Sequence, residues 1–133
     1  MLRLRMDDGR QTVSTGTPWE DRFGYSRAVR VDRFVSVSGT VGRNPDGSVP
    51  AGAYLQAKRA LDIIVAALEE VSARPEHVVR TRTFVTDVAC FGHVARAHNE
   101  LFKHVRPATS FVVVSGLLAP EFLLEIEADA IVG

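Results

Sequence analysis

Apolar and polar residues alternate along several stretches of the chain, as expected of β-strands with one buried face. The clearest stretch is 123–132, where Leu124 and Ile126 fall on one face and Glu125 and Glu127 on the other. Alternation or β-branched runs predict further strands at residues 2–6, 12–15, 25–31, 34–41, 78–87 and 111–114. The last of these is apolar throughout, which predicts a strand that is buried on both faces. Glycine and proline residues predict a loop at residues 16–24.

Two other stretches repeat with the period of an α-helix. Residues 53–71 place Leu55, Leu61, Ile64 and Leu68 on one face, and residues 91–105 carry a similar stripe that ends before Pro107. Together with Phe102 and Ile126, residues 61, 64 and 68 are the expected core. The order of hairpins, helix, strand, helix and two strands predicts a mixed α+β sheet with both helices on one face, because strand-helix-strand crossovers share one hand.

Composition narrows the class of protein. The 133 residues suit a single domain, 1–133, and 16 basic against 16 acidic residues leave no net charge for binding nucleic acid or an anionic membrane. The single cysteine, Cys90, excludes an internal disulfide and is expected to be a small buried residue. The chain has no long apolar run or signal sequence, so we expect a cytoplasmic protein. No histidine spacing indicates a metal site, and no cofactor is expected.

Five short segments, in order along the chain, resemble the YjgF/RidA family of reactive-intermediate deaminases. They are Gly-Tyr-Ser-Arg-Ala-Val at 24–29, Val-Ser-Gly at 37–39, the strand at 78–87, Arg-Pro-Ala-Thr-Ser at 106–110 and Leu-Leu-Glu-Ile-Glu-Ala at 123–128. The resemblance covers nearly the whole chain. It implies a chorismate-mutase-like fold and a homotrimeric barrel with ligand clefts between neighbouring subunits.

The resemblance also implies a set of site residues. Glu125 matches the family's water-positioning glutamate and is the candidate catalytic residue, although the stripe that it shares with Glu127 and Asp129 reads equally well as a solvated acidic face. The candidate ligand-binding residues are Tyr25, Ser38, Gly39, Phe91, Thr109 and Ser110.

Thr109 departs from the family pattern, which has an arginine there that binds the substrate carboxylate through two hydrogen bonds. Ala95 is a second departure, because many members of the family carry an asparagine at this position. Arg106 lies three residues before Thr109, so strand parity predicts that its side chain points to the opposite face of the sheet from Thr109. Arg82 could either bind the substrate in place of the missing arginine or form salt bridges on the strand face.

These features lead to two hypotheses about function. In the first, a trimer of the RidA type binds or hydrolyses a small imine or carbonyl metabolite, with uncharged ones among the candidates, and is a poor 2-imino-acid deaminase. In the second, the trimer is a non-catalytic module that binds a small molecule or a partner. The endoribonuclease activity attached to the family is disfavoured by the zero net charge and the lack of a base-stacking pattern.

Overall fold

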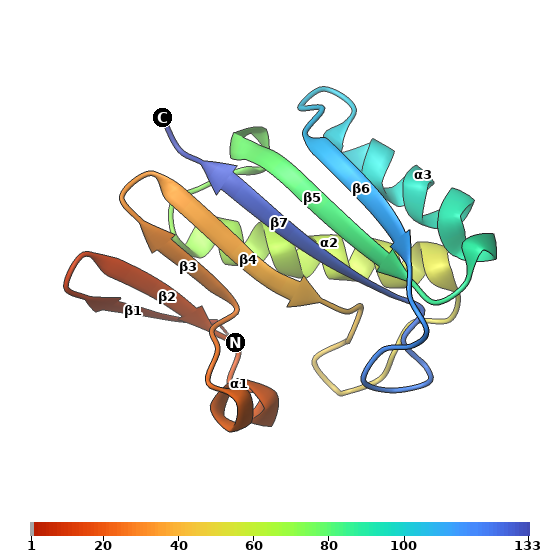
Figure 1. The fold of residues 1–133 in the computed structure, drawn as a ribbon. Helices are drawn as coiled ribbons and strands as arrows, with labels where there is room; N and C mark the ends of the chain where they lie inside the picture. The colour runs from red at the N-terminus through yellow and green to blue at the C-terminus, as the bar shows by residue number, and fades with distance from the viewer. Residues whose placement is uncertain (1) are drawn as a thin grey trace.

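The predicted alternation forms one seven-stranded sheet in the computed structural model, which describes residues 2–133; Met1 lies outside them (Figure 1). The strands are β1 (Arg3–Asp7), β2 (Arg10–Ser14), β3 (Ala28–Val31), β4 (Phe34–Thr40), β5 (Val78–Val85), β6 (Ala108–Val113) and β7 (Leu124–Ile131). The helices are α1 (Pro18–Phe23), α2 (Ala53–Glu70) and α3 (Phe91–Phe102), and short 3-10 turns precede β5 and α3 at Pro75–His77 and Val88–Cys90.

The strand order across the sheet is β1-β2-β3-β4-β7-β5-β6. Only β5 and β6 run parallel, and α3 connects them; every other neighbouring pair is antiparallel. The predicted hairpin turns are present, and Asp8 and Asp32 adopt positive φ there, a conformation that aspartate tolerates better than most residues. The C-terminal strand β7 therefore lies in the middle of the sheet, between β4 and β5.

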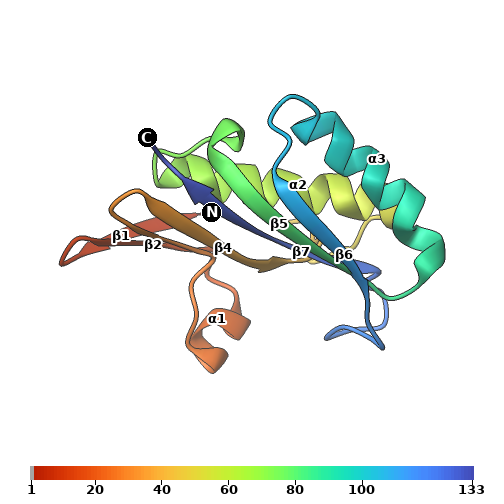
Figure 2. The ribbon, with the colours of Figure 1, turned by 45° about the horizontal axis from the view of Figure 1, so that its top comes forward.

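Helices α2 and α3 cover the same face of the sheet, as predicted, whereas α1 projects on the other side (Figure 2). The expected core is confirmed, because each of its five members is at most 3% exposed: Leu61, Ile64, Leu68, Phe102 and Ile126. Leu55 is the exception on the predicted helical stripe, since it is 53% exposed and Gln56 is buried in its place. The Gln56 side chain hydrogen-bonds Pro50 O, Glu121 O and Leu123 N, so it fixes the connection before β7.

Two expectations about local structure are wrong. Residues 111–114 are not buried on both faces, because β6 is an edge strand and Val112 and Val113 are exposed. Residues 18–23 form the helix α1 and not a loop. Its carboxylate Glu20 is buried and accepts hydrogen bonds from Ser14 Oγ at 2.9 Å and Thr15 N at 3.1 Å. This tertiary anchor lies outside the reach of local sequence patterns.

The sheet face opposite α2 and α3, here called the open face, carries exposed apolar side chains. Val31, Phe34 and Ile131 are neighbours across β3, β4 and β7, and all three are more than 40% exposed. Within residues 2–133, no helix is long and apolar enough to cross a membrane.

Candidate functional site

Glu125 lies over a bulge in the neighbouring strand. Val37 pairs with Ala128 and Thr40 with Ile126, so Ser38 and Gly39 together oppose the single residue Glu127. A Cβ built on Gly39 would come within 2.8 Å of the Glu125 carboxyl carbon. Only glycine therefore leaves room for this carboxylate to rest against the β4 backbone.

The surroundings of Glu125 shift its acidity. Phe84 stands beside it on β5, and burial raises the pKa of Glu125 above its usual range. The positive charge of Arg27 acts in the opposite direction and the negative charge of Glu127 in the same direction as burial. A carboxyl group with a raised pKa is suited to give and take protons near neutral pH.

Arg27 is a neighbour of Glu125 that the sequence did not single out as functional. Its Nη2 donates a hydrogen bond to Gly39 O at 2.7 Å, and its guanidinium lies 5.8 Å from the centre of the Tyr25 ring. Its Nε is buried without a hydrogen-bond partner. The position corresponds to a glutamine in the family pattern, and that change of residue type was the available signal.

Thr109 lies on the other side of the sheet from Glu125. It pairs in parallel with Thr81, whose buried hydroxyl donates to Thr109 Oγ1 at 2.7 Å and lies 2.8 Å from Nε2 of His98 on α3. Burial lowers the pKa of His98, which favours the neutral ring. Thr109 therefore sits at the exposed end of a buried chain of hydrogen bonds, on the face that carries the helices.

The structure thus divides the predicted site residues into two groups. Tyr25, Ser38 and Gly39 lie near Glu125, with Ser38 Oγ donating to Ser26 O at 2.6 Å. Phe91 lies on the side of Thr109, where its ring is 4.7 Å from that of Phe111. Ser110 points to the open face, as Glu125 does, but it lies on the edge strand β6, where it accepts a hydrogen bond from Arg80 at 2.8 Å.

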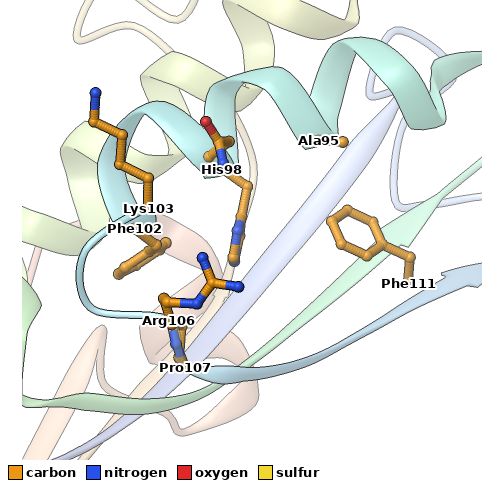
Figure 3. A pocket seen from close by; sticks show the side chains of 8 residues that line it. Ala95, His98, Phe102, Lys103, Arg106, Pro107 and Phe111 are labelled. Atoms are coloured by element: carbon orange, nitrogen blue, oxygen red, sulfur yellow. The ribbon is translucent and has the colours of Figure 1, made fainter.

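Arg82 and Arg106, the two arginines considered as substitutes for the family arginine at position 109, lie in different surroundings. Arg82 pairs with Asp129 at 3.1 Å and Glu127 at 3.3 Å on the open face, which is the salt-bridged arrangement. The expectation for Arg106 is wrong, because this residue precedes β6, has a φ of 57° and is not subject to strand parity. Its side chain lines a cavity of about 370 Å³ at the end of α3, together with residues of α3 and β6 (Figure 3).

The described part of the chain, residues 2–133, holds no cluster of three or more His, Cys, Asp or Glu side chains that could bind a metal ion. Cys90 is buried, as expected, and burial raises the pKa of its thiol.

Comparison with known proteins identifies the family. The sequence pattern of the family described as Endoribonuclease L-PSP matches residues 19–132. An uncharacterised protein of Streptomyces coelicolor is 38% identical over 119 residues, covering 89% of each chain. A 2-iminobutanoate/2-iminopropanoate deaminase of Rattus norvegicus is 32% identical over 126 residues, covering 93% of this chain and 91% of its own.

A solved structure agrees with these sequence matches. The crystal structure of a Mycobacterium tuberculosis member of the YjgF/YER057c/UK114 family is 43% identical, superimposes with a TM-score of 0.85 and covers 92% of this chain and 99% of its own. The chain therefore has the chorismate-mutase-like α+β fold and belongs to the Endoribonuclease L-PSP family, which includes the YjgF and UK114 proteins.

Proposed function

We propose that residues 1–133 form one RidA-like domain, that three copies close into a barrel, and that the clefts between copies bind a small imine or carbonyl metabolite. The observation that carries this proposal is the separation of the site residues. Glu125 and Thr109 lie on opposite faces of one sheet, so a single copy cannot bring them to the same ligand. A neighbouring copy that covers the open face would supply the second group, and the exposed apolar residues Val31, Phe34 and Ile131 favour such an assembly.

Imine hydrolysis is the reaction that suits Glu125. As a general base, its carboxylate takes a proton from water while the water oxygen adds to the carbon of the protonated imine, which gives a neutral amino alcohol. The carboxyl group then returns that proton to the amino nitrogen, and the carboxylate takes the hydroxyl proton as the C–N bond breaks to release ammonia and a carbonyl product. The raised pKa of Glu125 favours the first transfer, because it makes the carboxylate a stronger base.

Thr109 favours the second hypothesis, a trimer that binds its ligand without turnover. A threonine hydroxyl offers one hydrogen bond in place of the two charge-assisted bonds of an arginine. The loss of such a pair removes about 3 kcal/mol of transition-state binding, or roughly a hundredfold in rate. Wild-type protein is therefore expected to be an inefficient 2-imino-acid deaminase.

The two hypotheses are distinguished by the rate of hydrolysis of 2-iminobutanoate generated in situ. We expect wild-type protein to be little faster than buffer and Thr109→Arg to gain activity, since the substitution restores a carboxylate fork to the cleft. Adding Glu125→Ala should abolish that gain. No gain in Thr109→Arg would refute the enzyme and leave the binding module as the better hypothesis.

A further inference from the structure

We propose that a cavity beside α2 binds a small phosphate monoester, with Arg43 and Arg59 as the residues that bind its charge. The cavity has a volume of about 300 Å³ and is lined by residues of α2, of the segment that follows β4 and of the turn that follows β2. Small-molecule sites in proteins usually measure about 300–1,000 Å³, so this cavity suits a small ligand. The proposed cleft lies on the open face, whereas α2 covers the other face, so this inference goes beyond the proposed function.

The charges that line the cavity are the first argument. Three arginines and a single acidic residue contribute to the lining: Arg27, Arg43, Arg59 and Asp62. Within residues 2–133, none of these four forms a salt bridge. Three arginines against one aspartate leave two positive charges that the protein does not neutralise by direct pairing. A phosphate monoester carries a charge of about −1.5 to −2 at pH 7 and therefore matches them.

The available hydrogen-bond donors are the second argument. Arg59 Nε donates to Arg43 O at 3.0 Å, which holds α2 against the segment that carries Arg43. In the described part of the chain, this is the one hydrogen bond that either guanidinium group makes. The hydroxyl groups of Thr15 and Thr17, which also line the cavity, donate to the carboxylate of Glu20. The donors left for a ligand are therefore guanidinium N–H groups, whose planar forks match phosphate oxygens.

Arg27 is the third argument, because one of its donors is buried and has no acceptor. Its Nη2 donates to Gly39 O at 2.7 Å, but among residues 2–133 its Nε finds no hydrogen-bond partner. A buried donor without an acceptor destabilises a protein unless a bound group accepts its hydrogen. Since Arg27 lines the cavity, an anion bound there would offer the acceptor that the described chain does not.

The apolar part of the wall favours a monoester over free phosphate. Leu2, Val41, Pro45 and Ile63 contribute to the lining, and all but Pro45 are only partly exposed. A ring or short alkyl group attached to the phosphate would remove this apolar surface from water, which is worth about 25 cal/mol for each Å² that is covered. The cavity thus combines arginines for the phosphate with an apolar wall for the group that it esterifies.

Calorimetric titration of wild-type protein with phenyl phosphate at low salt tests this inference. Phenol keeps the ring and lacks the charge, inorganic phosphate keeps the charge and lacks the ring, and we expect phenyl phosphate to bind more tightly than either. Arg43→Gln and Arg59→Gln should each weaken phenyl phosphate binding by about tenfold or more, because each removes charged donors from the site. The matched control is Arg96→Gln on α3, which removes the same charge from an exposed position outside the cavity and should bind as the wild type does.

The outcomes that would overturn the inference are distinct. Equal binding of phenyl phosphate and phenol, or unchanged phenyl phosphate binding in either cavity variant, would exclude the arginine site. An equal loss of binding in Arg96→Gln would assign the effect to net charge and not to the cavity. Equal affinity for inorganic phosphate would refute the apolar contact and identify free phosphate as the ligand. Arg43 is exposed, so Arg43→Gln should keep the melting temperature of the wild type, and its loss of binding would not reflect unfolding.

Discussion

The contact between Gly39 and Glu125 gives the sharpest structural prediction. In Gly39→Ala, the new methyl group would lie 2.8 Å from the Glu125 carboxyl carbon, and one carboxylate oxygen would be closer still. The obstacle is the end of a flexible side chain, and Gly39 has no positive φ, so the protein should fold normally. The carboxylate must move by roughly 1 Å to reach an ordinary contact distance, and displacements of that size can cost about a hundredfold in rate.

Two assays follow the displacement. Titration of carbon-13-labelled glutamate by NMR should show the pKa of Glu125 fall toward its ordinary value, because the carboxylate is pushed away from the backbone that buries it. In a Thr109→Arg background, hydrolysis of 2-iminobutanoate should fall by about a hundredfold. Gly92→Ala on α3 is the matched control, since its methyl group would meet nothing within 4 Å and should leave both measurements unchanged. An unaltered pKa and rate in Gly39→Ala would refute the idea that the bulge positions Glu125.

Three further predictions concern assembly, core and pH. Sedimentation equilibrium at micromolar concentration should give three times the 14.5 kDa of one chain, and a stable monomer would contradict the proposed cleft. Ile64→Ala should lower the free energy of unfolding by about 2–5 kcal/mol in chemical denaturation, because Ile64 is fully buried between α2 and the sheet, and a loss below about 0.5 kcal/mol would contradict its assignment. Glu125→Gln should stabilise the protein more at pH 8 than at pH 4. Since the folded pKa of Glu125 is raised, the stability contributed by its protonated form is present at low pH and is lost as pH rises through that pKa; an equal effect at both pH values would show that Glu125 is not desolvated.

The long elements were predictable from the sequence because their periodicity follows burial. The stripe through Leu61, Ile64 and Leu68 and the alternation of β7 report which side chains face the core. The run at 111–114 misled because apolar residues alone do not distinguish a central strand from an edge strand. The short helix α1 depends on the buried carboxylate of Glu20, a contact with β2 and the turn after it that no local pattern contains.

The candidate site was predictable only in its residue types. Glu125 and Gly39 could be named from the family pattern, but the bulge that brings them together depends on the register between β4 and β7. Arg106 was misplaced because parity applies only inside a strand, and this residue lies in a turn with positive φ. The separation of Glu125 from Thr109 likewise follows from the pairing of β5 with β6 and β7.

A mixed trimer tests the central claim, that each site is completed by a second copy. Wild-type protein lacks the arginine fork, and the double variant Thr109→Arg, Glu125→Ala lacks the carboxylate, so either trimer alone should hydrolyse 2-iminobutanoate poorly. Unfolded in equal amounts and refolded together, they should regain about a quarter of the activity of the Thr109→Arg trimer, because one cleft in four joins an intact Glu125 to an introduced arginine. No recovery, alongside an active Thr109→Arg trimer refolded in the same way, would contradict a site shared between subunits.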